Sequence, residues 1–402
     1  MTRAVERVAV VSGVFPPSNS GEAQHALLLA RALAGCGLDV HVLTRRGVVS
    51  EPSVHVRPLM RGWTWRELPT LARFLRATAP DVVLLLYIGW TYENHPMVTY
   101  APTIARLVVP RARFVTQFEN AIGAEPYRYG FLGHNGWRAA AVLAGVRGVD
   151  YHFGTLLRDS DATVVLSEHH RRALAAHAPM AAARSALIPP PPLLTIVPEA
   201  DEVRRAERTR LGLDPDDFVV VHLGYLYPGK GIETLLRAFA LLATERERAK
   251  LLLVGGPLEG HEAYPATVRR LATELGIQKR VRWAGAYAWD GSRGSTLLRA
   301  ADVFVMPIEI GVQLNNSSVG AAAAHGLPLV ATRGELVERA FRDGENVLLC
   351  APRDPDAMAA AIRAVMDDEP LRRRLRRGAC ELADEWFSWR RAVDRTLASF
   401  SA

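Results

Sequence analysis

The chain of 402 residues is long enough for two or more domains, and its 49% hydrophobic and 23% charged residues are ordinary for a globular protein. Its net charge of +7 comes almost entirely from arginine, because Lys230, Lys250 and Lys279 are the only lysines. The arginines alternate with acids along helix-like segments, and no nucleic-acid motif accompanies them. A solvated helix face therefore explains the charge better than a nucleic-acid partner.

The cysteines and the hydropathy pattern limit the cellular setting. Cys36, Cys350 and Cys380 are far apart and fit neither a disulfide framework nor a zinc-finger spacing, which favours a reducing compartment. The first residues run straight into a strand without a signal-peptide pattern, and no run of about 18 apolar residues occurs. We expect a cytoplasmic protein, and the sequence does not indicate its oligomeric state.

Short apolar runs alternate with helical periodicity along most of the chain, which is typical of parallel-sheet α/β units. In the first half the predicted strands are residues 7–12, 39–44, 81–87, 113–118, 162–167 and 185–189. After a stiff proline run at 189–192, further strands are predicted at residues 218–224, 250–256, 280–285, 301–307, 327–332 and 346–352. We therefore expect two doubly wound, Rossmann-like domains, residues 1–195 and 196–385. A C-terminal helix within residues 386–402 is expected to pack back on the first domain.

Ligands of such sheets bind beyond the carboxyl ends of the strands, so the loops at those ends are the candidate sites. The first loop ends in Ser20 and Gly21, which precede a helix with Glu22 in its first turn. A helix start of this kind can hold an anion. Serine and glycine are also ordinary helix caps, so both interpretations stay open.

The stretch HLGYLYPGKGIETLLRAF, residues 222–239, satisfies most of a P-loop pattern through Gly224, Gly229 and Lys230. Gly231 stands where a serine or threonine would bind magnesium, which argues against a nucleotide kinase. A lysine at a helix start is disfavoured by the helix dipole unless an anion compensates it. We therefore predict that Lys230 binds a phosphate, and is not merely an exposed lysine without a binding role.

The stretch GVQLNNSSVGAAAAHGLPLVAT, residues 311–332, predicts a second phosphate site without a catalytic side chain. Asn315, Asn316, Ser317 and Ser318 supply caps and hydroxyl donors, and the amides of the following helix can bind phosphate. A small-residue helix buried between the sheet and a neighbour predicts the alanines equally well. Two phosphate sites in one domain suggest a diphosphate, and hence a sugar nucleotide.

Taken in order, several segments resemble the retaining glycosyltransferases of family four, which have the GT-B fold of two Rossmann-like domains facing across a cleft. The segments are FPPSNSGEAQHALLLARALAGCGLDVHVLT, DATVVLSEHHRRAL, GYLYPGKGIETLLRAF, RVRWAGAY, AADVFVMP, AHGLPLVAT and DGENVLLCAPRDPDAMAAAI. By this resemblance Lys230, with neighbouring Gly224, contacts the donor diphosphate. The amides around Ser317 and Ser318 hold its distal phosphate. The loop at Ser20 and Gly21 closes over the donor, and the nucleotide lies near Gly255.

The chain departs from the family pattern on the donor side. Tyr225 replaces the usual arginine after the first glycine of the lysine segment. The family's two glutamates fall at Gln313 and Ala321 when counted back from AHGLP. Counted forward from Pro307, the loop is longer and Glu309 replaces the first acid. Gln313, Asn315 and Asn316 complete the predicted donor site, and Lys230 and Glu309 are two of the three predicted catalytic residues.

The acceptor side departs as well. Phe118 occupies the place of the family's usual histidine, beside Glu119, which is the third predicted catalytic residue. Glu119 and the cluster Tyr92, Glu93 and His95 are the candidate acceptor contacts. For each of them, an ordinary loop residue in water or a helix cap is the simpler interpretation.

The resemblance implies a retaining transfer that needs no metal and no cofactor other than the nucleotide-sugar co-substrate. The DPDD, DSD and DPD segments are typical of turns and caps, so no metal site is predicted.

The acceptor can be a natural product, a saccharide or a lipid-linked saccharide. Residues 135–148 could rest on a membrane surface, although a buried helix explains them more simply. A non-catalytic sugar-nucleotide-binding protein is the main alternative. A dinucleotide oxidoreductase is less well supported, because neither opening strand is followed by a complete GxGxxG.

Overall fold

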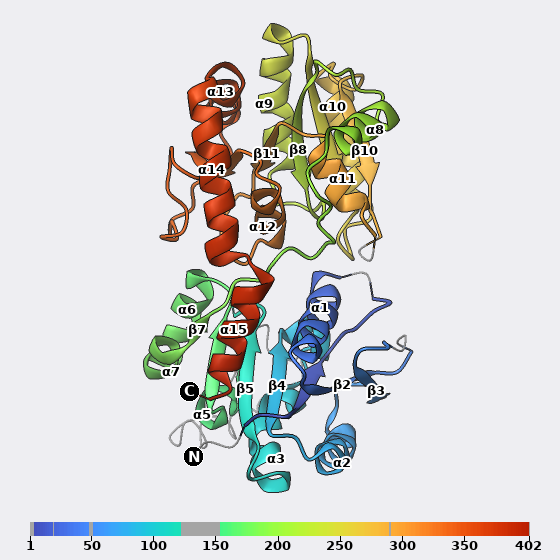
Figure 1. Cartoon of the computed structure of the whole chain (residues 1–402), viewed down its shortest axis with the longest axis vertical. Coiled ribbons are helices and arrows are strands. Elements are labelled where there is room, and N and C mark those ends of the chain that lie inside the picture. The colour runs from blue at the N-terminus through green and yellow to red at the C-terminus, as the bar shows by residue number, and fades with distance from the viewer. Residues whose placement is uncertain (1–3, 19, 48–50, 122–152, 289–290, 402) are drawn as a thin grey trace, which may run out of the picture. The chain divides into compact units, whose positions relative to one another are not determined.

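The computed structural model describes residues 4–18, 20–47, 51–121, 153–288 and 291–401 (Figure 1). The chain divides into two compact units. The first unit comprises Met1–Pro189 together with Trp389–Ala402, and the second comprises Pro190–Ser388. Residues 135–148, considered above for a membrane surface, lie outside the described residues.

The first unit is built on a seven-stranded sheet with the order β3-β2-β1-β4-β5-β6-β7, in which every neighbouring pair is parallel. Its strands are β1 (Arg7–Ser12), β2 (Asp39–Arg45), β3 (His55–Met60), β4 (Val82–Tyr87), β5 (Arg113–Phe118), β6 (Ala162–Val165) and β7 (Ala186–Leu187). The central strand β4 is buried along its whole length, as expected for a sheet covered on both faces. The edge strand β3 is largely exposed, and the sequence did not predict it.

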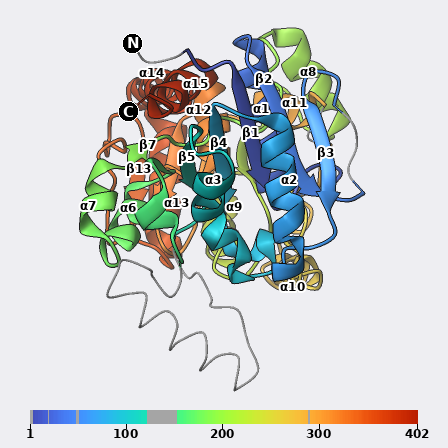
Figure 2. The same cartoon turned by 90° about the horizontal axis from the view of Figure 1, so that it is seen from below.

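Helices cover the sheet of the first unit, and the last helix of the chain is one of them (Figure 2). The α-helices are α1 (Gly21–Gly35), α2 (Leu68–Thr78), α3 (Ala101–Val108), α5 (Leu156–Asp159), α6 (Glu168–Ala175), α7 (Pro179–Arg184) and α15 (Trp389–Ser399). The 3-10 helices are η1 (Trp65–Glu67), η2 (Gly89–Tyr92) and η3 (Pro96–Tyr100). Helix α15 packs beside α1 and β6, with the ring of Trp389 6.4 Å from that of His25.

The second unit has a six-stranded parallel sheet with the order β10-β9-β8-β11-β12-β13. Its strands are β8 (Phe218–Leu223), β9 (Ala249–Val254), β10 (Val281–Gly285), β11 (Val303–Met306), β12 (Leu329–Thr332) and β13 (Leu348–Cys350). Its helices are α8 (Asp201–Arg210), α9 (Ile232–Glu245), α10 (Tyr264–Glu274), α11 (Arg293–Arg299), α12 (Ser317–Ala324), α13 (Pro355–Asp367) and α14 (Glu369–Trp386). The two predicted doubly wound units are therefore confirmed.

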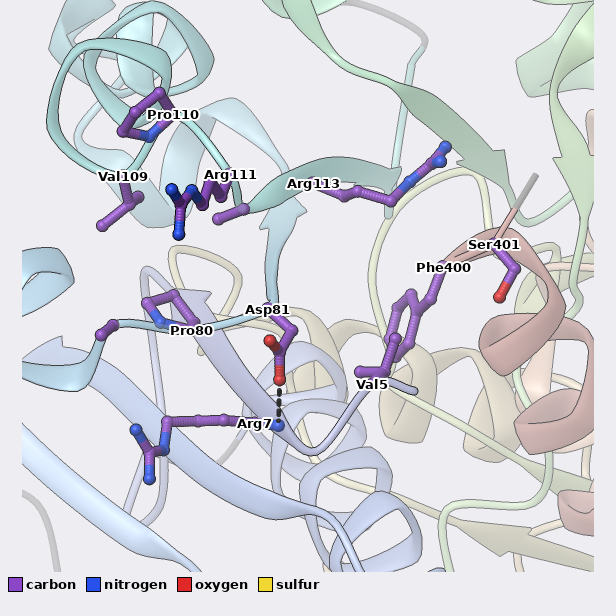
Figure 3. A pocket seen from close by; sticks show the side chains of 12 residues that line it. Val5, Arg7, Pro80, Asp81, Val109, Pro110, Arg111, Arg113, Phe400 and Ser401 are labelled. Carbon is purple, nitrogen blue, oxygen red and sulfur yellow. Dashed lines mark hydrogen bonds between the residues drawn. The ribbon is translucent and has the colours of Figure 1, made fainter. Parts of the chain in front are cut away.

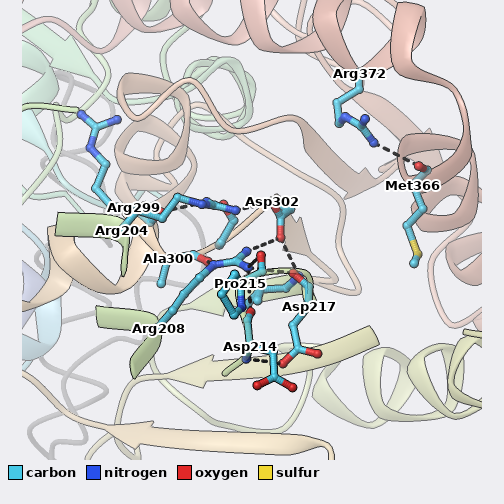
Figure 4. A network of polar contacts seen from close by, with 12 residues as sticks. Arg204, Arg208, Asp214, Pro215, Asp217, Arg299, Ala300, Asp302, Met366 and Arg372 are labelled. Atoms are coloured by element: carbon cyan, nitrogen blue, oxygen red, sulfur yellow. Dashed lines mark hydrogen bonds and ion pairs between the residues drawn. The ribbon is translucent and has the colours of Figure 1, made fainter. Parts of the chain in front are cut away.

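A polar network fastens α8 to the amino ends of the strands in the second unit (Figure 4). Arg204 and Arg208 each donate to a different oxygen of Asp302, at 2.6 and 2.7 Å. The same carboxylate accepts the backbone amide of Val219 at 2.7 Å. Arg208 is almost fully buried, and three further carbonyl bonds from its Nη1 satisfy its charge. The charged segment after the proline run thus belongs to the second unit.

Each sheet reverses its strand order beside its first strand, and such a switch point is where doubly wound folds bind ligands. In the first unit this point lies between β1 and β4, so the loops after those strands form the candidate edge. In the second unit it lies between β8 and β11, and the loops there contain Lys230 and Glu309.

Candidate functional site

The loops that follow β8, β9 and β11 touch one another at the carboxyl edge of the second sheet. The amide of Glu309 donates to the carbonyl of Gly229 at 3.0 Å, and the amide of Leu226 donates to that of Gly256 at 2.9 Å. Gly231 has a left-handed backbone (φ 78°), and a Cβ there would overlap the carbonyl oxygen of Pro307. Only glycine allows this approach.

Lys230 lies in this group of loops and is only 7% exposed. Burial lowers the pKa of its ammonium to about 8. Among the residues that the structure describes, no carboxylate pairs with Nζ and no acceptor hydrogen-bonds to it; Nζ lies 5.7 Å from the centroid of the Tyr227 ring. A buried charge without a partner is costly, so this position is suited to an anionic ligand that supplies the missing charge.

His222, at the end of β8, lies beside Lys230. Its Nδ1 is 3.0 Å from the carbonyl oxygen of Val305, and its Nε2 is buried with no hydrogen-bond partner among the described residues. Burial, and then the charge of Lys230, lower the pKa of His222 to about 3, so the ring is neutral near pH 7 and Nδ1 is the donor. A Cβ on Gly224 would be 3.6 Å from Lys230 Nζ and 3.7 Å from His222 Nε2. Both nitrogens therefore lie on the side of Gly224 where a side chain would begin.

Two helices begin at this edge without a side-chain cap. Helix α9 starts after Gly231, which has no side chain to cap it. Helix α12 starts after Asn316, whose Oδ1 instead accepts the amide of Gln313 at 3.0 Å. The first amides of both helices therefore lack side-chain acceptors, and amides of this kind bind phosphate oxygens.

Packing explains the small residues of α12. Residues 319–323 are buried. A Cβ on Gly320 would lie 2.7 Å from the ring of Phe387, at the end of α14. Ala321 is buried, and its carbonyl oxygen is 2.7 Å from His325 Nδ1. Of the two interpretations of the alanine run, the buried helix is therefore the one that the structure supports, and only the first turn remains for a ligand.

The sheet brings all the predicted donor-side residues of the second unit to one edge. Gly224, Tyr225 and Lys230 follow β8, Gly255 follows β9, and Glu309, Gln313, Asn315, Asn316, Ser317 and Ser318 follow β11. Gln313 is buried, whereas the asparagines and serines are half-buried. Glu309 accepts two bonds from Arg353, at 2.8 Å from Nε and 2.5 Å from Nη2. The predicted acid is therefore an ion-pair partner in the ligand-free chain.

In the first unit the helix start predicted to close over a donor is a capped one. The hydroxyl of Ser20 accepts the amide of Ala23 at 3.2 Å, and Gly21 is the first residue of α1. Gly13, after β1, lies so close to Thr91, after β4, that a Cβ would overlap it. The loops of this switch point are therefore in contact too.

Glu119, at the end of β5, forms a buried pair with His25 of α1. The carboxylate is 2.9 Å from His25 Nδ1 and accepts a bond of 2.6 Å from Gln117 Nε2. Burial lowers the pKa of His25, but the charge and hydrogen bond of Glu119 outweigh it, and the pKa is raised overall. Burial raises the pKa of nearby Glu22. Glu119 was predicted from the sequence, whereas His25 and His222 were not.

The predicted acceptor cluster needs correction. Tyr92 is fully buried, with its hydroxyl 2.7 Å from the carbonyl of Leu86, so it is a core residue and offers no surface to an acceptor. His95 is buried and caps η3 by accepting the amide of Met97 at 3.1 Å. Glu93 is partly exposed and lies 3.4 Å from Arg45. Of these three residues, Glu93 is the one whose side chain is exposed to solvent.

A cavity of about 670 Å³ lies elsewhere, at the amino ends of β1, β4 and β5 (Figure 3). Arg7, Asp81 and Arg113 line it, together with Phe400 from the C-terminus. This edge of the sheet is opposite the loops discussed above.

Among the residues that the structure describes, no helix is both long enough and apolar enough to cross a membrane.

Comparison with known proteins gives a consistent result. Residues 217–368 match a family model described as "Glycosyl transferases group 1". D-inositol 3-phosphate glycosyltransferase of Thermomonospora curvata is 35% identical over 214 residues, which are 50% of this chain and 46% of that enzyme. The same enzyme of Acidothermus cellulolyticus is 36% identical over 201 residues, 48% of this chain and 43% of that enzyme. The chain thus matches about half the length of these curated relatives.

Solved structures match over nearly the whole chain. Anabaena HepE in complex with UDP and glucose has a TM-score of 0.71 at 17% identity, covering 99% of this chain and 100% of that one. Sucrose-phosphate synthase of Thermosynechococcus elongatus has a TM-score of 0.68 at 19% identity, covering 98% of each chain. WaaG, a glycosyltransferase involved in lipopolysaccharide biosynthesis, has a TM-score of 0.66 at 18% identity, covering 96% of this chain and 98% of that one. At these identities the likeness shows the fold, and the predicted GT-B fold is confirmed.

Proposed function

We propose that this GT-B chain, whose second unit belongs to the group 1 glycosyltransferase family, transfers a sugar from a nucleotide-diphosphate donor to a hydroxyl acceptor. The observation that carries the proposal is Lys230, a buried ammonium without an anionic partner in the described chain, at the switch point of the second sheet. Helix α9 begins directly after it, α12 begins in the loop after β11 at the same edge of the sheet, and neither start has a side-chain cap. A diphosphate supplies the charge and the acceptor oxygens that these groups lack.

The transfer that fits these groups breaks the bond between the anomeric carbon and the diphosphate oxygen. Negative charge grows on the leaving diphosphate, and Lys230 and the first amides of α12 stabilise that charge more in the transition state than in the ground state. The acceptor hydroxyl attacks from the leaving-group side and gives its proton to the diphosphate oxygen, so configuration is retained. This route needs no nucleophile from the enzyme.

We expect the transfer to proceed without a divalent cation, because the lysine and the helix amides take the place of a cation on the leaving group. Adding EDTA to an assay with metal-free enzyme should change the initial rate by less than about twofold. A rate that collapses with EDTA and returns with magnesium would show that a metal carries the leaving-group charge.

The direct test is calorimetric titration of the chelator-treated chain with UDP, GDP, ADP and dTDP. We begin with UDP because it is the nucleotide bound in the HepE structure. One nucleotide should bind in the micromolar range, and Lys230→Met should weaken it by at least about tenfold. If none of the four binds, the site does not accept nucleotide diphosphates.

Once a nucleotide is identified, the acceptor is sought with D-inositol 3-phosphate, the substrate named for the curated relatives, and with saccharides and lipid-linked saccharides.

The second candidate function is sugar-nucleotide binding without catalysis. It is favoured by Gln313 and Ala321 at the positions of the family's glutamates and by the engagement of Glu309 with Arg353. Nucleotide binding without release of free sugar or transfer to any acceptor would support this function over catalysis.

Donor binding should take up a proton at Lys230 in mildly alkaline solution. The pKa of the free lysine is about 8, and a bound diphosphate raises it, so above pH ~8 binding must first protonate the amine. His222, with a pKa of about 3, does not titrate there, and the phosphates are already ionised. Affinity should fall as pH rises from about 7.5 to 9.5, approaching tenfold per pH unit. Titrations in buffers of different ionisation enthalpy should show proton uptake that Lys230→Met abolishes.

A further inference from the structure

The amino half of the first sheet carries a cluster of two histidines and one aspartate that plays no part in the proposed transfer. Asp39 and His41 are two residues apart on β2, and His55 is the direct partner of His41 on β3. Because side chains alternate along a strand, all three lie on the same face of the sheet. β3 is the outermost strand and lies beside β2 in both views (Figures 1 and 2).

The three side chains converge on one carboxylate oxygen. Oδ1 of Asp39 is 3.1 Å from Nε2 of His41 and 3.4 Å from Nε2 of His55. The two imidazoles stack with their centroids 4.7 Å apart, and one ligand atom from each residue lies within 4.8 Å of the other two. Tetrahedral zinc with ligands at about 2.0–2.1 Å separates neighbouring ligand atoms by about 3.4 Å. The distances from Asp39 Oδ1 to the two histidine Nε2 atoms are therefore already close to the distances between ligand atoms around a bound zinc ion.

The surrounding charges leave the right atoms available. Arg7 Nε holds the other oxygen of Asp39, Oδ2, at 2.7 Å, which leaves Oδ1 for the cluster. Arg57, two residues after His55 on β3, is the second positive charge near the cluster. The Nδ1 of His41 is buried, so its Nε2 is the nitrogen open to a ligand. The two arginines weaken cation binding, and we expect a moderate rather than a tight site.

We propose that Asp39, His41 and His55 bind one zinc ion, with water in the fourth position. Two imidazoles and one carboxylate form a ligand set that suits zinc, whereas magnesium and calcium prefer oxygen ligands. His55 is 59% exposed and His41 only 12%, so an ion can enter from the solvent side and reach the buried ligand. The ion joins the edge strand β3 to β2. It lies far along the strands from the carboxyl edge, so it is a structural site and leaves the metal-free transfer proposed above unchanged.

The test uses the full chain without a histidine tag, treated with chelator and titrated with zinc chloride. One equivalent should bind, and His55→Gln should weaken binding by at least about tenfold. His261→Gln is the matched control, because it removes an exposed histidine from the second unit and should leave the affinity unchanged. An excess of magnesium should not compete.

A second measurement separates ligand loss from misfolding. Zinc should raise the melting temperature of the wild-type chain and of His261→Gln but not that of His55→Gln, while all three melt alike in chelator. Cobalt should give the visible absorption bands of a tetrahedral site in the wild type and in His261→Gln but not in His55→Gln. Absence of stoichiometric binding overturns the proposal. Equal binding by His55→Gln also overturns it, because the ion would then occupy another site, such as a cysteine.

Discussion

Replacing Lys230 by methionine is expected to lower kcat/KM for the nucleotide-sugar donor by about 10²–10³-fold, the usual loss when one preorganised donor to a developing anion is removed. Methionine keeps most of the volume of the buried stem and removes only the charge. The loss should appear in kcat as well as in KM, because the charge on the diphosphate is greatest in the transition state. Steady-state rates with the nucleotide sugar identified by calorimetry measure it.

The same substitution should leave the ligand-free chain at least as stable as the wild type. Lys230 is buried without a partner in the described chain, so methionine removes a desolvation cost and breaks no ion pair. Lys250→Met is the matched control, because Lys250 Nζ is 3.0 Å from the buried carboxylate of Asp217. This second variant should lower the melting temperature and keep kcat/KM within about twofold. If Lys230→Met melts early, or retains wild-type kcat/KM, Lys230 has a structural role and the proposed donor site is wrong.

The sequence predicted the sheets well because most of their strands are short, buried apolar runs. Strand β3 was missed because its sequence, HVRPLM, is not a continuous apolar run and is mostly exposed, and its proline is tolerated only because the strand lies at a sheet edge. That omission also concealed the His41 and His55 pair, since the register of β3 against β2 brings the two rings together.

The place of Lys230 just before a helix was predictable because its signal is local: glycines on both sides and a helix-like sequence immediately after it. His222 and His25 were not, because their roles depend on partners distant in the sequence. The ring of His222 is fixed by Val305, and that of His25 by Glu119. The alanines of α12 were ambiguous for the same reason, since the ring of Phe387 that requires Gly320 comes from the end of α14.

Gly231→Ala is expected to destabilise the chain by about 3 kcal/mol or more and to weaken nucleotide binding at least tenfold. Part of the cost is the left-handed backbone (φ 78°), which is worth about 1–2 kcal/mol for any residue with a Cβ. The larger part is the overlap of the new Cβ with the carbonyl of Pro307, which forces apart the loops after β8 and β11. Denaturant unfolding and nucleotide titration measure the two effects.

Gly229→Ala separates the two contributions within the same loop. Gly229 is also left-handed (φ 88°), but a Cβ there has no atom within 4 Å, so only the backbone cost of about 1–2 kcal/mol applies. Nucleotide affinity should stay within about threefold of the wild type, because Lys230 and Pro307 do not move. If both variants lose the same stability and affinity, the contact with Pro307 does not position Lys230. If only Gly231→Ala loses the nucleotide, the close approach of the two loops is what holds the buried ammonium at the switch point of the sheet.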